Sequence, residues 1–317
     1  MHKDTTNIEH YVAPLEETPL AETDKVKDDV QPLSLWGEAW RNLRRQPTFI
    51  ISSLLILLIL AAAAFPGLFT SASPDENCLL ANSNGDPVSG HPLGFTFQGC
   101  DVYARVIYGT RASLMVGVIT TLAVVIIGGI LGALAGYYGG WLDAILARLG
   151  DIFFALPLIL GAIIIMQLPA FRENRTTLTV VFTLLVFGWP QVARITRGAV
   201  LSVRNADFVI ASRALGVSKF SALVKHVIPN AMAPVIVIAT ISLGTFIVAE
   251  ATLSFLGIGL PPSIMSWGND ISSAQTSLRT DPAALLWPAG ALSLTVLSFI
   301  MLGDAVRDAL DPKARKR

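Results

Sequence analysis

Charged residues and chemically reactive motifs are both scarce in this sequence. Only 15% of its 317 residues are Asp, Glu, Lys or Arg, whereas 53% are hydrophobic, and the mean hydropathy is +0.60. The G-x-x-x-x-G-K-[ST] phosphate loop, the H-E-x-x-H zinc motif and the G-x-S-x-G nucleophile motif are all missing. We therefore expect no catalytic residue, no metal site and no nucleotide site in this chain. Such an apolar composition excludes an ordinary soluble domain and indicates a membrane protein.

Long segments without any charged residue account for the high hydropathy. A helix needs about 20 apolar residues to cross the hydrocarbon core of a bilayer. Because a helix satisfies its own backbone hydrogen bonds in lipid, we predict an all-α polytopic membrane protein with six transmembrane helices. The six predicted helices cover residues 48–69, 114–138, 152–169, 176–193, 227–249 and 282–303.

Basic residues are distributed unevenly around these six segments. If both termini lie in the cytosol, 18 of the 23 Lys and Arg residues are cytosolic and five are outside. Cytosolic loops of membrane proteins carry this kind of excess, so the sequence predicts an N-in, C-in orientation. The predicted segments, in order, are a flexible acidic cytosolic tail (1–32), an amphipathic elbow helix (33–47), the first transmembrane helix (48–69), an extracytoplasmic loop (70–110), a core of five transmembrane helices with a cytosolic loop at 205–228 (111–312), and a basic cytosolic tail (313–317). For residues 33–47, a plain helix end beside the membrane is an equally good interpretation.

Both cysteines, Cys78 and Cys100, fall in the predicted extracytoplasmic loop. Disulfides persist outside the cytosol, so we predict a Cys78–Cys100 bridge, which would contribute on the order of 3 kcal/mol. Two free thiols are the main alternative, and a metal site that includes His91 is a further one.

Two features within the predicted helices concern packing. Gly128, Gly132 and Gly136 are spaced four residues apart, so they line one helix face and allow another helix to approach closely. Pro157 lies inside the predicted helix at 152–169 and is expected to kink it.

A polar stretch interrupts the apolar chain at residues 207–229 and predicts a helical hairpin. Asn205 or Asp207 is suited to cap a first helix, which Gly216 would end, and Ser218 is suited to cap a second. In the first helix, Phe208, Ala211 and Leu215 share one face. The second helix has apolar residues at the i, i+3, i+4 and i+7 spacing, namely Phe220, Leu223, Val224 and Val227. Such an amphipathic hairpin fits a groove on another protein, although an interfacial helix on lipid is the alternative.

The segment "ASRALGVSKFSALVKHVIP" (211–229) resembles the coupling loop of permease subunits of ABC importers. Gly216 takes the place of that loop's glycine and Ala211 of an alanine, and Ile228 and Pro229 close the motif. Ile210 replaces the usual Glu, which favours the dipeptide, oligopeptide and nickel subgroup, where "ARALG…HILPN" is usual. The segments 91–117, 249–270 and 302–312 are also similar to that subgroup, specifically to its second permease subunit.

The resemblance implies a type I ABC importer permease fold in the bacterial cytoplasmic membrane, with a coupling helix in the cytosol. It implies four partners besides the lipid bilayer: a homologous second permease, two cytosolic ATPases and an extracytoplasmic substrate-binding protein. ATP and Mg²⁺ would be bound by the ATPases, and no nucleic acid is involved. The substrate would be a di- or oligopeptide, with nickel, haem or another small solute as alternatives. An ion channel or a membrane scaffold is the alternative from a different functional class.

Two sets of residues are candidates for function. The residues expected to couple to an ATPase are Phe208, Ala211, Ser212, Arg213, Ala214, Leu215, Gly216, Lys219, Phe220 and Pro229. The candidates for the pathway or its gates are Glu250, Arg194, Arg197 and Gln191. Glu250 has a structural alternative, in which it pairs with a helix N-terminus or an arginine. Arg194 and Arg197 are explained equally well as cytosolic anchors of their helix.

Overall fold

The computed structural model describes residues 35–76 and 78–310, and within these ranges it is helical. The predicted tails at 1–32 and 313–317 lie outside the described residues. The longer helices are α1 (Leu35–Leu43), α2 (Pro47–Ala64), α3 (Val102–Tyr138), α4 (Gly140–Ala155), α5 (Leu158–Met166), α7 (Thr177–Val203), α8 (Asp207–Ala214), α10 (Ile228–Phe255), α11 (Trp267–Ala274) and α12 (Ala283–Leu310). The short elements are η1 (Pro66–Leu68), η2 (Leu80–Asn82), α6 (Pro169–Arg172), α9 (Lys219–Ala222), η3 (Leu223–Val227) and η4 (Gln275–Ser277).

Five helical segments in the described ranges are long and apolar enough to cross a membrane. They are α2, α3, α7, α12 and the continuous stretch Lys219–Phe255, which contains α10. A sixth crossing is obtained if α4 and α5 are counted together, but these two helices meet at 86°. The predicted helix at 152–169 is therefore broken, and the break falls at Pro157, which cannot donate a backbone hydrogen bond and precedes α5.

Several predicted helix boundaries differ from the observed ones: α7, α10 and α12 each extend past the predicted end, to Val203, Phe255 and Leu310. Two further differences have a visible local cause. The second predicted helix was expected from residue 114, whereas α3 begins at Val102, where the Asp101 carboxylate accepts from the backbone N–H groups of Tyr103 and Ala104. The first predicted helix was expected to reach residue 69, whereas α2 ends at Ala64 and Pro66 begins a separate 3₁₀ turn. Hydropathy marks the apolar part of a helix, and capping groups and prolines decide where the helix ends.

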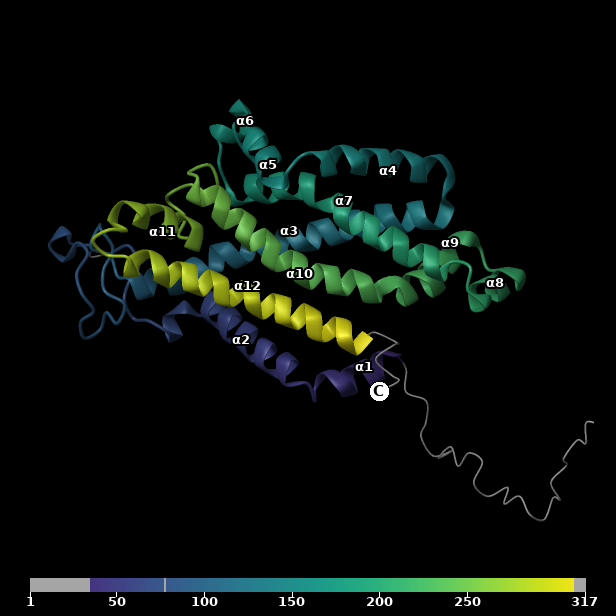
Figure 1. Ribbon diagram of the computed structural model, residues 1–317, viewed down its shortest axis with the longest axis horizontal. Coiled ribbons are helices and arrows are strands. Elements are labelled where there is room, and N and C mark those ends of the chain that lie inside the picture. The colour runs from purple at the N-terminus through teal and green to yellow at the C-terminus, as the bar shows by residue number, and fades with distance from the viewer. Residues whose placement is uncertain (1–34, 77, 311–317) are drawn as a thin grey trace, which may run out of the picture.

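α3 lies at the centre of the bundle and packs along α7 and α10 (Figure 1). Gly128, Gly132 and Gly136 lie on one face of α3, as their spacing predicts, and the helix that this face approaches is α7. A Cβ atom on Gly132 would lie 2.3 Å from the Ala193 carbonyl oxygen, so only glycine permits this approach of the two backbones. The main core beside this contact is apolar, with Val124, Leu184 and other aliphatic side chains fully buried.

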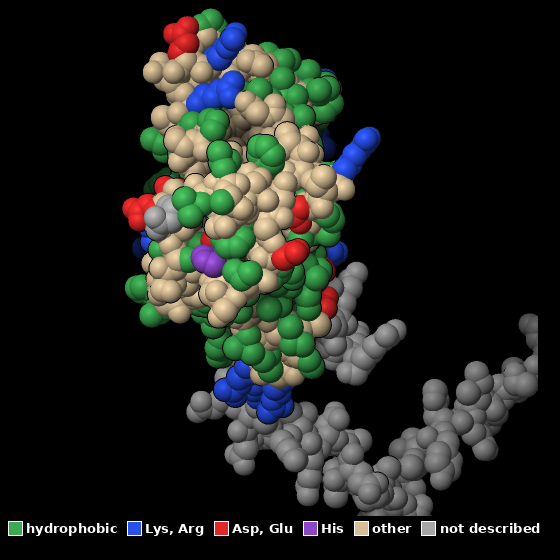
Figure 2. All heavy atoms as spheres, turned by 90° about the vertical axis from the view of Figure 1, so that its left-hand side faces the viewer, with side chains coloured by type: hydrophobic (Ala, Val, Ile, Leu, Met, Phe, Trp, Pro, Cys, Tyr) green, Lys and Arg blue, Asp and Glu red, His purple; other side chains and the backbone are tan. Residues whose placement is uncertain are grey.

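The bundle has two ends of different character (Figure 1). α11 and the loop that joins η1 to α3 form one end, called the α11 end below. α8 and α9 project at the other, the α8 end, toward which the C-terminal end of α12 also points. Figure 2 looks onto the α11 end and shows polar side chains and backbone over its middle, with acidic side chains in several places.

Candidate functional site

The first arm of the predicted hairpin is α8. It is capped differently from the prediction, because Ala206 holds the N-cap position in an extended conformation and makes no side-chain cap. The expectation that Asn205 or Asp207 caps the helix is therefore wrong. Asp207 is instead the first helical residue, where its negative charge is favourable beside the helix N-terminus.

Gly216 makes the turn between the two arms. Its φ is 90°, a left-handed conformation that costs a residue with a Cβ atom about 1–2 kcal/mol. The Gly216 N–H donates to the Arg213 carbonyl at 3.0 Å and the Val217 N–H donates to the Ser212 carbonyl at 3.2 Å. Both bonds satisfy carbonyl groups at the end of α8, as expected for a glycine that ends a helix.

The second arm is shorter and less regular than its periodicity predicts. Ser218 caps it as expected, since its Oγ accepts from the Ser221 N–H at 3.2 Å. α9 then covers only Lys219–Ala222, and the chain enters α10 through the π-helical turn η3. This wider turn rotates the following residues relative to α9, and it separates the four apolar positions that were expected on one face.

Burial divides the hairpin into two faces. Leu223 and Val227 are buried together with Val209, and they pack on Ala133 of α3 and Val200 of α7. The other apolar positions point away from the bundle: Leu215 is 86% exposed and Phe220 is 65% exposed. Of the ten predicted coupling residues, all are exposed except Ser212, which is half-buried. The hairpin therefore has one face fixed to the bundle and one face free in this chain.

The free face has an unusually apolar character for an exposed surface. We define the docking surface as the exposed large hydrophobic residues of the hairpin, which are Phe208, Ile210, Leu215, Phe220 and Val224. Arg213 and Lys219 are exposed beside it and supply a polar rim. Clustered exposed apolar side chains with a polar rim mark interaction sites.

Arg194 and Arg197, two of the candidates for the pathway or its gates, lie near the α8 end of α7 and both pair with α4. Arg197 forms two hydrogen bonds with Asp143, the second of which joins Nη2 and Oδ2 at 2.7 Å. Arg194 lies 3.5 Å from Asp151, and its guanidinium stacks 4.2 Å from the centre of the Phe154 ring. Both arginines line a cavity of about 190 Å³ between α3, α4 and α7, whereas Gln191 is exposed and does not line it.

Glu250 is completely buried in α10 and is held by hydroxyl groups. Ser113 of α3 donates to its Oε2 at 3.1 Å, and Ser254 donates to its Oε1 at 2.8 Å. Ser113 in turn accepts from the Trp267 N–H at the start of α11. The structural alternative for Glu250 was pairing with a helix N-terminus or an arginine. In the structure two serines pair with it, and one of them, Ser113, connects it to the N-terminus of α11.

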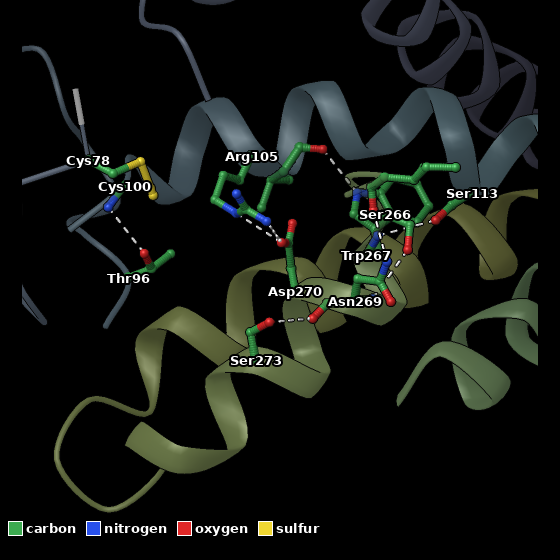
Figure 3. A network of polar contacts seen from close by, with 12 residues as sticks. Cys78, Thr96, Cys100, Arg105, Ser113, Ser266, Trp267, Asn269, Asp270 and Ser273 are labelled. Carbon is green, nitrogen blue, oxygen red and sulfur yellow. Dashed lines mark hydrogen bonds and ion pairs between the residues drawn. A yellow bond between two sulfur atoms is a disulfide. The ribbon is translucent and has the colours of Figure 1, made fainter. Parts of the chain in front are cut away.

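Sequence reasoning missed an ion pair at the α11 end. Arg105 of α3 and Asp270 of α11 point toward each other in Figure 3, and two guanidinium nitrogens donate to Asp270 Oδ1 at 2.9 and 2.5 Å. Burial raises the pKa of the Asp270 carboxyl above its ordinary value, and the positive charge of Arg105 opposes that rise. The two residues are 165 positions apart in the sequence. The sequence shows only that Arg105 and Asp270 carry opposite charges and that each lies beside a predicted membrane helix, which does not indicate that they pair.

The loop at the α11 end is closed by the predicted disulfide between Cys78 and Cys100 (Figure 3). His91 pairs with Asp101 at 2.9 Å, which ties the loop to the start of α3. Within residues 35–76 and 78–310, no group of three or more His, Cys, Asp or Glu side chains could hold a metal ion. The bridge leaves no thiol for the alternative metal site with His91.

Comparisons with known proteins agree on one family. Residues 128–316 match the family described as the binding-protein-dependent transport system inner membrane component. Residues 34–87 match the N-terminal transmembrane domain of oligopeptide transport permease C.

Curated relatives cover almost the whole chain. The oligopeptide transport system permease protein OppC of Bacillus subtilis is 36% identical over 92% of this chain and 94% of its own length. The dipeptide transport system permease protein DppC of the same organism is 38% identical over 93% of this chain and 90% of its own length. The glutathione transport system permease protein GsiD of Pectobacterium atrosepticum is 34% identical over 88% and 92%.

Solved structures support the fold. A chain of the MetNI methionine ABC transporter, in an inward-facing conformation, superimposes with a TM-score of 0.53 at 20% identity. The match covers 65% of this chain and 96% of the other. At this identity the likeness concerns the helical architecture alone.

Proposed function

Because this chain belongs to the inner membrane components of binding-protein-dependent transport systems, we propose that it forms half of the translocation pathway of an ATP-driven peptide importer. A homologous permease would supply the other half, and an extracytoplasmic protein would deliver the substrate. Three relatives are named for oligopeptide, dipeptide and glutathione transport, and this supports a short peptide as the substrate.

The docking surface is the part of this chain that meets a cytosolic ATPase. The observation that carries this assignment is the exposure of Leu215 and Phe220 on either side of Gly216, at the end of a hairpin whose opposite face is packed on the bundle. A large apolar side chain that leaves water at the centre of an interface contributes much of its binding energy. Arg213 and Lys219 would contact the rim of the same groove.

The packed face explains how a displaced hairpin would move the membrane helices. Val209, Leu223 and Val227 contact residues of α3, α7 and α10 together, and Arg204 donates to the Gly136 carbonyl of α3 at 2.8 Å. ATP and Mg²⁺ would be bound by the partner, whose closure favours one arrangement of the hairpin over another. A ligand shifts a conformational equilibrium only through such a difference in contacts between two states.

The α8 end is assigned to the cytosol of a bacterium and the α11 end to the outside of its cytoplasmic membrane. Arg194, Arg197, Arg204, Arg213 and Lys219 lie toward the α8 end, as the excess of cytosolic basic residues requires. The disulfide lies at the α11 end, which is then the oxidising side. Glu250, Arg194, Arg197 and Gln191 remain candidates for the pathway or its gates on this proposal.

The assignment is tested by placing a charge on the docking surface of the assembled transporter. We expect Leu215→Asp to reduce co-purification of the ATPase and ATP-dependent peptide uptake at least about tenfold, because a buried unpaired carboxylate weakens an apolar interface. Leu80→Asp is the matched control, since Leu80 is 76% exposed at the α11 end. Equal ATPase recovery with the two variants would refute docking at Leu215.

A further inference from the structure

A second cavity lies at the α11 end, on the opposite side of the protein from the docking surface. Its volume is about 370 Å³, within the range of small-molecule sites. The start of α3, α11 and the start of α12 form its walls, and residues 96–98 of the disulfide-closed loop complete it. The proposed function assigns no role to this cavity.

The Asp270 carboxylate, which lines this cavity, does not have hydrogen-bond partners for both of its oxygens in the described part of the chain. Both hydrogen bonds from Arg105 go to Oδ1 of Asp270, which leaves Oδ2 buried and without a hydrogen-bond partner among the described residues. Asp270 itself is only 8% exposed. A buried carboxylate oxygen without a partner is costly, so its presence beside an open cavity points to a missing donor.

The guanidinium of Arg105 also has a donor group, Nη1, that is not used in the bonds to Asp270. Its Nε and Nη2 bind Asp270, whereas no hydrogen bond joins Nη1 to any residue in 35–76 or 78–310. Arg105 and Asp270 both line the cavity, and Figure 3 shows their side chains pointing toward each other. The cavity therefore offers one acceptor for a cation and one donor for an anion, side by side.

The remaining wall is mainly apolar. Val102, Ala274 and Ala284 are buried in one small cluster, and Val106 and Pro288 continue this surface. A molecule that fills the cavity thus needs an apolar part as well as a charged end. Free inorganic ions do not provide this combination.

We propose that this cavity binds a small zwitterion with an apolar body. Its primary ammonium pairs with the Asp270 carboxylate, its carboxylate or phosphate accepts from Arg105, and its apolar part covers Val102 and Ala284. A simple cation would be repelled by Arg105 and a simple anion by Asp270, whereas a zwitterion meets an opposite charge at both ends. Two sources carry this chemistry: a free amino acid with an apolar side chain, and the headgroup region of phosphatidylethanolamine.

Leucine binding to the whole transporter tests the free amino acid. The assembled complex is placed in nanodiscs of phosphatidylcholine, which has no primary ammonium, and binding of radiolabelled leucine is measured without ATP or binding protein. We expect N-acetyl-leucine and leucinamide, which each lack one of the two charges, to compete at least about tenfold more weakly than unlabelled leucine, since each loses a charge-assisted hydrogen bond.

A pair of threonine substitutions locates the site. Thr276 is exposed at the rim of the cavity, and its hydroxyl donates to the Ser273 carbonyl; Thr280 is exposed outside the cavity and donates in the same way to Ser277. We expect Thr276→Trp to weaken leucine binding at least about tenfold by filling the cavity, and Thr280→Trp to leave it unchanged.

Phosphatidylethanolamine is tested with the same pair of variants. The complexes are reconstituted with this lipid, and native mass spectrometry measures how much lipid stays bound. Retention by Thr280→Trp and loss by Thr276→Trp identifies the lipid as the occupant. The proposal is overturned if the wild type retains neither leucine nor this lipid, or if Thr276→Trp retains as much of both as the control. Peptide uptake and ATPase recovery do not enter these readouts, so failure here is distinct from failure of the proposed function.

Discussion

Glu250 shows how a carboxyl group is accommodated in the middle of an apolar bundle. Its two oxygens accept from Ser113 and Ser254, and those serines accept in turn from the Trp267 and Leu260 backbone N–H groups. The carboxyl group therefore fixes the chain after α10 and the start of α11 against α3. This position makes it a structural connector between three elements rather than an isolated polar residue.

The connector can be tested by shortening or neutralising the side chain. We expect Glu250→Ala to lower the free energy of unfolding by about 1–3 kcal/mol, because it leaves a cavity and removes the acceptor of two buried hydroxyls. Glu250→Gln keeps the shape and one carbonyl acceptor, so its effect should be smaller. Thermal unfolding of the detergent-solubilised chain measures both. A larger loss with Gln than with Ala would contradict this role.

Residues near each other in the sequence could be assigned roles in advance, and distant pairs could not. Gly216 and Ser218 were identified correctly because a helix end and a helix cap depend on a few neighbouring residues. Arg105 and Asp270 pair only because α3 and α11 pack together, and their local segments contain no trace of that contact. The same reason hid the partners of Arg197 and Glu250.

At the scale of the helix, the contact between α3 and α7 depends on three glycines at four-residue spacing. A Cβ atom added to each glycine would lie only 2.3–2.8 Å from a carbonyl oxygen of α7, that of Trp189, Ala193 or Arg197. The spacing predicted this face, but it did not identify α7 as the partner. The extra α4 segment was not expected either, because Asp143, Arg148 and Asp151 interrupt its apolar sequence and hide it from a search for uncharged runs.

Two glycines of α3, Gly132 and Gly129, allow the effect of close packing to be separated from the effect of helix propensity. We expect Gly132→Ala to lower the free energy of unfolding by about 1–3 kcal/mol, since the new Cβ would lie 2.3 Å from a backbone oxygen of Ala193. Gly129 lies on the same helix, with nothing within 4 Å of the position of its Cβ. Gly129→Ala should therefore be tolerated. Equal melting temperatures of the two variants would show that the helices separate without cost.

At the scale of the whole molecule, the two ends of the bundle differ in how many contacts hold them in place. The α11 end is braced by a disulfide, the Asp101 cap and the Arg105–Asp270 pair. The α8 end carries a hairpin that is packed on one face alone. The prediction that both termini lie in the cytosol places the braced end outside and the open end toward a soluble partner.

Cysteine labelling in intact cells tests this orientation. In a Cys78→Ser/Cys100→Ser background, we expect Thr280→Cys to react with a membrane-impermeant maleimide added outside, because Thr280 is exposed near the α11 end. Ala214→Cys, at the exposed end of α8, should react only after the membrane is permeabilised. The reverse pattern would invert the proposed topology and exclude a cytosolic role for the hairpin.

The exposed hairpin also has a consequence for how cells balance the amounts of this subunit. On the proposed function, Leu215 and Phe220 become covered when an ATPase binds, so a copy made in excess would display them to the cytosol. Chaperones and proteases act on exposed apolar segments of this kind. If the docking surface meets an ATPase as proposed, we expect it also to mark unassembled copies for removal, so that the lifetime of this subunit depends on the supply of its partner.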